Sequence, residues 1–252
     1  MSASTLSRWR GRTALVTGAS SGIGRAIAVD LGRMGLNVAL TGRREAELQV
    51  TAEAVRLAGG TPLVLTCDQT QPGVHAPLFA RIRERWGGVD LLVNNAGMRG
   101  GIRLLDTDLR EIEQALILNV VAAIACMQEA ISDQRTRAEG AIIVLSSMTG
   151  HRVLPGTPAL YAATKHALRI VTDGLRSEVA QARLPIKVAL ISPGMVDTPW
   201  HRQPGGVASR AGGFPHPPLQ PGDIVDALRY ILSTPPGVQV CDIQLKPAEQ
   251  VN

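Results

Sequence analysis

Aromatic residues are scarce in this chain of 252 residues, where they make up 3% of the total and include only two tyrosines. Cysteine is scarce as well: Cys67, Cys126 and Cys241 are the three present, and they form no Cys-x-x-Cys pair. An odd, scattered set of cysteines argues against a disulfide framework and against a thiolate metal site. We expect each cysteine to be a small buried apolar residue in a core of Val, Leu, Ile and Ala.

Lysine is scarce too, because only three of the 26 basic residues are lysines. The formal net charge is nevertheless +5. The basic residues are dispersed, with no run of five and no interleaved aromatic residues. Scattered surface arginines, together with a local site for an anionic cofactor, therefore explain the charge better than a nucleic-acid surface does. We expect no nucleic-acid partner.

Long apolar runs are also missing. No stretch approaches the ~20 residues that a membrane span requires, and the N-terminus lacks the apolar region of a signal peptide. The expectation is a soluble, cytoplasmic protein without a membrane span. The five histidines form no dense ligand pattern such as His-Glu-x-x-His, so we expect no metal site.

Apolar residues, at 45% of the chain, supply a sizeable core, and the length suits one large α/β domain over residues 1–252. Short β-rich runs alternate with amphipathic stretches, which predicts a parallel, doubly wound sheet. The expected strands are Arg12–Val16, Asn37–Thr41, Pro62–Thr66, Val89–Asn94, Ala141–Ser146, Ile186–Ile191 and Val238–Leu245. The clearest helical patterns end near Arg33 and cover Glu45–Leu57, Asp108–Ile131, Tyr161–Ala182 and Gly222–Leu232.

One segment breaks this alternation. Residues Pro199–Pro221 are rich in Gly and Pro and include Trp200, His201, Phe214 and His216. Such a composition is not expected to hold a regular helix. Long loops in compact α/β domains are often functional, so one interpretation is a substrate-covering segment. The other is a disordered surface loop.

A glycine-rich segment, Thr17–Gly24, follows the first expected strand and opens the first helix. Gly18 would allow a tight exit from the strand, Gly22 a close approach of backbone to a pyrophosphate, and Gly24 close packing of helix on sheet. The helix N-terminus would offer unpaired N–H groups to the anion. A glycine-rich turn in this βαβ context predicts a dinucleotide-binding site.

The second expected strand leads into Gly42, Arg43 and Arg44. NAD-binding proteins usually carry an acidic residue here that holds the ribose 2′-hydroxyl. A guanidinium can instead bind a 2′-phosphate through two charge-assisted hydrogen bonds. We therefore expect NADP(H), with Arg43 as the first candidate and Arg44 as the second. The competing interpretation is a pair of solvated surface arginines.

Tyr161 and Lys165 are four residues apart and so lie on one face of the expected helix. A unit charge ~4 Å from the phenol is worth about 4 kcal/mol at an effective dielectric of about 20, or up to about three pKa units. We expect Lys165 to lower the pKa of Tyr161 into the range of a general acid or base. The alternative is an ordinary surface i,i+4 pair.

Two further polar residues stand where a ligand could reach them. Ser147 follows the fifth expected strand, and the ligand crevice of a parallel sheet lies at the carboxyl ends of its strands. Ser146 is the alternative candidate, and its hydroxyl could instead satisfy backbone groups at the end of the strand. Asn119 is a polar residue on an otherwise apolar helical face, where a helix-packing hydrogen bond is the plainer interpretation.

Several motifs together identify a family. TGASSGIG, NNAG at Asn94–Gly97, Asn119, Ser147, YAATK at Tyr161–Lys165 and SPG at Ser192–Gly194 follow the order and spacing of short-chain dehydrogenases/reductases. The resemblance covers nearly the whole chain. It implies a single Rossmann-type sheet of about seven strands in the order 3-2-1-4-5-6-7, with helices on both faces. The stretches RWRGRTALVTGASSGIG, SSMTGHRVLP, ISPGMVDT and LSTPPGVQVCDIQLKPAEQV resemble one branch of it, NADPH-dependent keto-reductases of steroids and other carbonyl compounds.

The resemblance also implies roles. Tyr161 would donate a proton, Ser147 would hold the carbonyl oxygen, Lys165 would bind the nicotinamide ribose, and Asn119 would hold a water that links Lys165 to solvent. Asp68 would contact adenine. The full cofactor set would be Gly18, Ser20, Ser21, Gly22, Ile23, Gly24, Arg43, Arg44, Cys67, Asp68, Asn95, Ala96, Gly97, Tyr161, Lys165, Pro193, Gly194, Val196 and Thr198. Members of the family are commonly tetramers or dimers, so a homo-oligomer is expected.

The leading hypothesis is thus an NADP(H)-dependent carbonyl reductase or alcohol dehydrogenase acting on a small-molecule substrate. A second class is a protein that senses NADP(H) without turnover, although a sensor would need to keep only the phosphate-binding turn. A third is a reductase of imines or activated double bonds, which the same hydride geometry would serve. The sequence does not separate the substrates.

Overall fold

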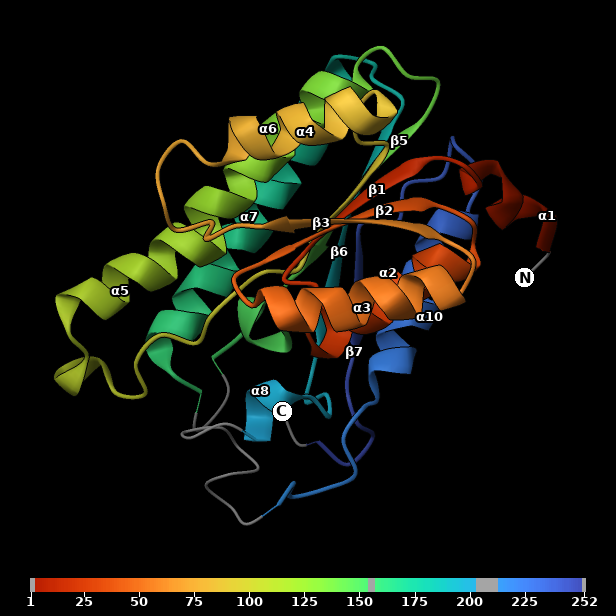
Figure 1. Ribbon diagram of the computed structural model, residues 1–252. Coiled ribbons are helices and arrows are strands. Elements are labelled where there is room, and N and C mark those ends of the chain that lie inside the picture. The colour runs from red at the N-terminus through yellow and green to blue at the C-terminus, as the bar shows by residue number, and fades with distance from the viewer. Residues whose placement is uncertain (1–2, 154–156, 203–212, 251–252) are drawn as a thin grey trace.

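A parallel sheet of seven strands lies at the centre of the computed structural model, which describes residues 3–153, 157–202 and 213–250 (Figure 1). The strand order is β3-β2-β1-β4-β5-β6-β7, which confirms the predicted sheet. The strands are β1 (Thr13–Thr17), β2 (Asn37–Gly42), β3 (Thr61–Thr66), β4 (Leu91–Asn94), β5 (Gly140–Leu145), β6 (Ile186–Pro193) and β7 (Asp242–Leu245).

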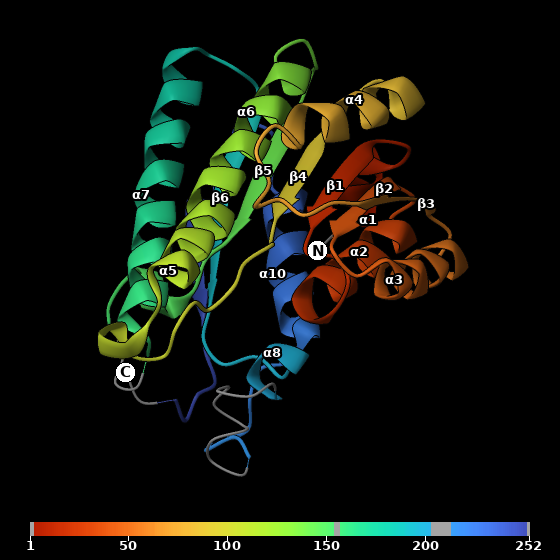
Figure 2. The same cartoon turned by 60° about the vertical axis from the view of Figure 1, so that its left-hand side comes forward.

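Helices cover both faces of this sheet (Figures 1 and 2). One face carries α2 (Gly22–Arg33), α3 (Glu45–Leu57) and α10 (Pro221–Ser233); the other carries α4 (His75–Trp86), α5 (Leu109–Leu116), α6 (Ala122–Gln134) and α7 (Ala159–Gln181). The short pieces are α1 (Ala3–Leu6), η1 (Ser7–Trp9), η2 (Leu104–Asp106), η4 (Met148–Gly150) and α8 (Pro199–Arg202). Two apolar cores result, one on each face. Every residue of β1, β5 and β6 is buried, as expected for strands that are covered on both sides.

The last strand is shorter than the predicted Val238–Leu245, because only Asp242–Leu245 forms a ladder with β6. The physical reason is that the side chain of Gln239 makes the hydrogen bonds to β6 that the backbone of β7 would otherwise make. Gln239 accepts from the Val188 N–H at 3.1 Å and donates to the Val188 carbonyl at 2.9 Å. These two bonds satisfy the peptide groups that an earlier start of β7 would have paired.

The predicted helix Asp108–Ile131 is a continuous helical run over Leu109–Gln134, in which one π-helical turn, η3 (Ile117–Val121), joins α5 to α6. Within the described part of the chain, this run is the one helix long and apolar enough to cross a membrane by length and composition. A buried helix of a packed core passes the same test. Here α6 packs against β4, β5 and α4, which accounts for its apolar surface.

The Gly/Pro-rich segment Pro199–Pro221 begins with a short helix, contrary to the expectation, because Pro199–Arg202 forms α8. A proline is tolerated in a first helical turn, where its missing N–H has no partner to lose. Residues 203–212 lie outside the described residues. From Gly213 the chain runs irregularly to a single bridge between Leu219 and Val196.

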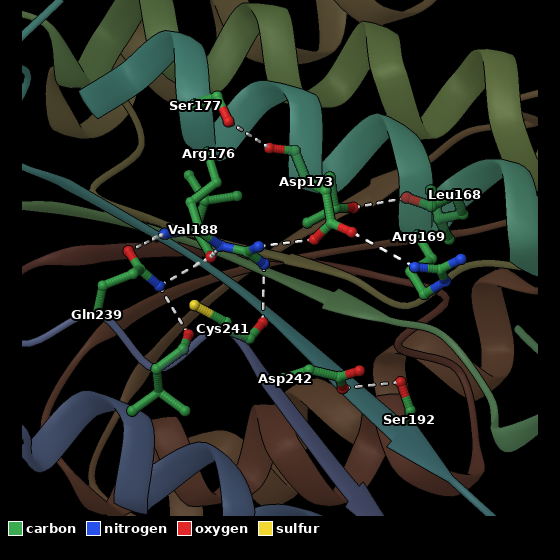
Figure 3. Close-up of polar contacts among 12 residues, drawn as sticks. Leu168, Arg169, Asp173, Arg176, Ser177, Val188, Ser192, Gln239, Cys241 and Asp242 are labelled. Carbon is green, nitrogen blue, oxygen red and sulfur yellow. Dashed lines mark hydrogen bonds and ion pairs between the residues drawn. The ribbon is translucent and has the colours of Figure 1, made fainter. Parts of the chain in front are cut away.

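The edge strand β7 is tied to the molecule by Arg176 of α7 (Figure 3). Its guanidinium donates to the Val188 carbonyl of β6 at 2.9 Å and to the Cys241 carbonyl, just before β7, at 2.8 Å. Asp173, one turn earlier on α7, holds the guanidinium at 2.6 Å. One side chain thus joins a helix to the last two strands.

Replacing this clamp tests its contribution to stability. In Arg176→Met the aliphatic stem remains, but the carbonyls of Val188 and Cys241 lose a charge-assisted donor, so we expect a loss of about 2 kcal/mol in the free energy of unfolding. For a chain of this size that corresponds to a fall in Tm of roughly 4–8 °C. Thermal and denaturant unfolding measure both. As the matched control, Arg56→Met removes an exposed ion pair to Glu53 on α3 and should cost less than about 0.5 kcal/mol. Equal losses in the two variants would contradict the clamp.

Candidate active site

The carboxyl ends of β1, β2, β4, β5 and β6 border a single cleft of about 1780 Å³. Parallel strands all end on the same side of a sheet, so the segments that follow them meet there. The glycine-rich turn follows β1, the NNAG motif follows β4, and Ser147 follows β5. Segments that are far apart in the sequence are therefore neighbours around this cleft.

The glycine-rich turn leaves no room for side chains at two of its glycines. Gly18 has φ +65°, and a Cβ there would lie 2.9 Å from the Cα of Ala96. A Cβ on Gly24 would lie 2.4 Å from the Gly18 carbonyl oxygen, closer than real Cβ atoms come. Gly22 has φ +55°, and a Cβ there would lie 3.1 Å from the Thr198 side chain. The turn is thus packed tightly between α2 and the segments after β4 and β6, and the N-terminus of α2 opens beside it.

The NNAG motif holds this turn in place. The Asn95 side chain donates to the carbonyls of Thr17 at 2.9 Å and Gly18 at 3.2 Å. In return, the Thr17 hydroxyl accepts from the backbone N–H groups of Asn95 and Ala96, both at 2.9 Å. These four bonds join the ends of β1 and β4, so Asn95 also has a structural role in shaping the cleft.

The two arginines after β2 occupy different positions. Arg44 donates to the hydroxyls of Ser20 and Ser21 at 2.8 Å each, which places its guanidinium over the glycine-rich turn. Arg43 is exposed and acts electrostatically on Asp68. Burial opposes ionisation of Asp68, but hydrogen bonds from Thr70 and the charge of Arg43 outweigh it and lower the pKa of the carboxyl. Of the two arginines, Arg44 is the one bonded to the turn.

Tyr161 and Lys165 stand near the start of α7 and point into the cleft. The Tyr161 hydroxyl hydrogen-bonds with the Ser147 side chain. The Lys165 Nζ lies 5.7 Å from the centroid of the Tyr161 ring and donates to the Leu145 carbonyl at the end of β5, at 2.9 Å. Ser147 is oriented by Thr149, whose N–H and hydroxyl both donate to its Oγ. The three side chains predicted to act together are therefore adjacent.

The pKa values of this group differ from the expectation. Burial lowers the pKa of Lys165 to about 8, so its ammonium is only partly charged slightly above neutral pH. Burial raises the pKa of Tyr161 to about 12, against the lowering effects of Ser147 and Arg99. The expectation that Lys165 lowers the pKa of Tyr161 was wrong for the protein alone. The expectation placed a full charge ~4 Å from the phenol, whereas desolvation is the larger effect on both groups.

Asn119 lies in the π-helical turn η3 and is 1% exposed. Its amide donates to the Met98 carbonyl at 2.8 Å and to the Thr164 hydroxyl at 3.0 Å, while its oxygen accepts from the Met98 N–H. These bonds join η3 to α7 and to the segment after β4. The helix-packing interpretation is thus confirmed, and the water-holding role stays a prediction. A π-helical turn is common at functional sites.

Most of the predicted positions line the cleft, with the exceptions of Gly24, which packs beneath the turn, and Asn119. The lining positions are Gly18, Ser20, Ser21, Gly22, Ile23, Arg43, Arg44, Cys67, Asp68, Asn95, Ala96, Gly97, Ser147, Tyr161, Lys165, Pro193, Gly194, Val196 and Thr198.

Sequence reasoning missed Arg99, which lines the cleft two residues after NNAG. Its position soon after the end of a strand was the available signal, but any arginine in a loop carries the same weak signal. Trp200 and His201 of α8 also line the cleft. The sequence had left their segment open between a substrate-covering segment and a disordered surface loop. Within the described ranges, no group of three or more His, Cys, Asp or Glu could hold a metal ion.

Comparison with known proteins places the chain in a family. The family model described as short chain dehydrogenase matches residues 12–204. Dehydrogenase/reductase SDR family member 11 of Mus musculus is 38% identical over 100% of both chains. Farnesol dehydrogenase of Aedes aegypti is 36% identical, over 96% of this chain and 98% of its own.

A solved structure agrees with these relatives. A short chain dehydrogenase from Burkholderia cenocepacia, in complex with NADP, superimposes with a TM-score of 0.82 at 31% identity, covering 94% of this chain and 97% of its own. The family match, the full-length relatives and the shared sheet all agree with the motifs around the cleft. The chain belongs to the short-chain dehydrogenase/reductase family of oxidoreductases.

Proposed function

We propose that this oxidoreductase reduces a ketone or aldehyde to an alcohol, or carries out the reverse reaction, with NADP(H). The observation that carries the proposal is the meeting of Ser147, Tyr161 and Lys165 in the same cleft as the glycine-rich turn. A protein that only senses the dinucleotide would have no need of a phenol and a hydroxyl hydrogen-bonded to each other beside it.

The cleft fits a dinucleotide at the turn. Gly18 and Gly22 have positive φ, so a side chain at either position would be strained and the backbone of the turn is left open to a ligand. The N-terminus of α2 beside it suits a pyrophosphate. Arg44 and Arg43 would hold a 2′-phosphate, and Lys165 would hold the ribose next to the nicotinamide. When bound, NADPH supplies the hydride that reduces the carbonyl carbon.

The proton comes from the protein. With its pKa raised to about 12, Tyr161 is protonated at neutral pH and can donate to the oxygen of a carbonyl as that oxygen gains negative charge. Ser147, held by Thr149, would bind the same oxygen and orient it toward the phenol. This protonation state favours reduction near neutral pH, and oxidation at higher pH, where Tyr161 can act as the base.

Removing the phenol hydroxyl tests the proposed acid. Tyr161→Phe should lower kcat by about 10²–10⁴-fold, because proton transfer loses its donor, while NADPH binding stays intact. Turnover is measured as NADPH oxidation with ketosteroids, diketones, quinones and small keto-esters. The chain's other tyrosine gives the matched control: Tyr230 of α10 is 48% exposed, and Tyr230→Phe should retain activity. Undiminished turnover in Tyr161→Phe would show that Tyr161 is not the proton donor. NADPH binding without turnover in the wild type would favour a sensor.

The cofactor preference rests on the two arginines after β2. Arg44→Ala should lower kcat/KM for NADPH by about 10–100-fold, since a charge-assisted hydrogen bond to a phosphate is worth about 1.5–3 kcal/mol. The kcat/KM for NADH should change less than about threefold, because NADH lacks the 2′-phosphate. Arg43→Ala should act in the same direction, and Arg56→Ala, on the exposed side of α3, should change neither. A loss that is equal for both cofactors would refute the assignment.

Self-association is part of the proposal. Leu109 and Leu116 of α5, Val121 of η3 and Ile170 of α7 are all exposed apolar residues, and α5 packs beside α7. An apolar face on two neighbouring helices is suited to a second copy of the chain. Ile170→Glu should therefore lower the particle mass measured by light scattering. Leu57→Glu on α3, where Leu57 is 81% exposed, is the control that should leave the mass unchanged. A wild-type protein that is already monomeric would refute this part.

The substrate is proposed to be a hydrophobic carbonyl compound. Met98, Met148, Met195 and Trp200 line the cleft and give it apolar walls, and Trp200 contacts Tyr161. The names of two relatives, a farnesol dehydrogenase and a dehydrogenase/reductase, agree with an alcohol or carbonyl substrate.

A further inference from the structure

Arg99 connects two parts of the cleft that the proposed reaction does not otherwise link. It follows β4, and its guanidinium donates to the Trp200 carbonyl of α8 at 2.8 Å. The same guanidinium lies over the Trp200 ring, 5.6 Å from the centroid. A planar cation stacked on an indole and bonded to the backbone of the same residue holds both the ring and the helix that carries it.

The Trp200 ring in turn contacts the proposed acid. Its centroid lies 5.9 Å from that of the Tyr161 ring, at an interplanar angle of 50°, which is a tilted aromatic contact. A chain of contacts therefore runs from the segment after β4, through Arg99 and Trp200, to Tyr161 on α7. Each of these three side chains also lines the cleft.

The charges around Tyr161 single out Arg99. Lys165 faces the phenol from α7, but its pKa of about 8 leaves it uncharged at the alkaline pH where a tyrosine ionises. On α8, burial and the charge of Arg99 lower the pKa of His201 to about 4, so this imidazole is neutral, while Asp197 before α8 is paired with Arg202. The guanidinium of Arg99 is the charge that favours the ionised phenol.

We propose that Arg99 is a positioning residue for the reaction: it holds Trp200 against Tyr161 as the wall of the substrate site. This inference rests on the proposed reductase function for its kinetic consequences, but the charge effect exists in the protein alone.

The first experiment needs no turnover. In the Tyr230→Phe background, Tyr161 is the only tyrosine, so tyrosinate absorbance during an alkaline titration reports its ionisation directly. Adding Arg99→Gln should move this titration to higher pH by about one unit, because the phenolate loses a favourable positive charge. Circular dichroism at each pH confirms that the fold is intact.

Arg202→Gln provides the matched comparison. Arg202 is an arginine of α8, the helix that Arg99 contacts, but it pairs with Asp197, is 64% exposed and does not line the cleft. In the same background it should leave the Tyr161 titration within about 0.2 units of the parent. Equal shifts in the two variants, or none in Arg99→Gln, would overturn the charge effect.

The second experiment tests the positioning through kinetics. Arg99→Gln and Trp200→Ala should each raise the substrate KM by roughly tenfold while leaving the NADPH dissociation constant nearly unchanged. The double variant should raise KM no further, because Arg99 acts through Trp200. Additive effects would overturn this link. Absence of turnover in the wild type would instead refute the proposed function, and the titration would still decide the role of Arg99.

Discussion

Parallel pairing of β1 with β4, and of β4 with β5, is the constraint on which the site depends. Parallel strands end at the same edge of a sheet, so the segments that leave them must lie side by side. Bonds across this edge then set the distances: Asn95 joins the ends of β4 and β1, and Lys165 joins α7 to the end of β5. The cleft is therefore shaped mainly by backbone carbonyls and the side chains that bind them.

Depth within this cleft decides what each cation can do. Lys165 is buried and has its pKa lowered to about 8, which suits a hydrogen-bond donor more than a fixed charge. Arg44 is exposed and donates to the hydroxyls of Ser20 and Ser21 in the glycine-rich turn. Arg99 lies over the Trp200 ring and donates to the Trp200 carbonyl. These three basic side chains of the cleft thus differ in burial and in the groups they contact.

Much of the fold was predictable, because its signals are local or periodic. The apolar runs predicted the buried strands, and the glycine spacing predicted the tight turn before α2. The start of β7 was not predictable, since the long-range bonds of Gln239 to Val188 replace part of the ladder. Neither was α8, a single turn in a Gly/Pro-rich segment, nor the π-helical turn that carries Asn119.

The sequence by itself determined the family, the sheet and most of the residues around the cleft, because each motif carries its own backbone requirement or side-chain chemistry. Only the tertiary structure decided the ionisation of Tyr161 and Lys165, which depends on the water that packing removes from both groups. It likewise decided which arginine lies over the glycine-rich turn and which one contacts Trp200. Burial and through-space charge come from residues far apart in the chain, and no local pattern records them.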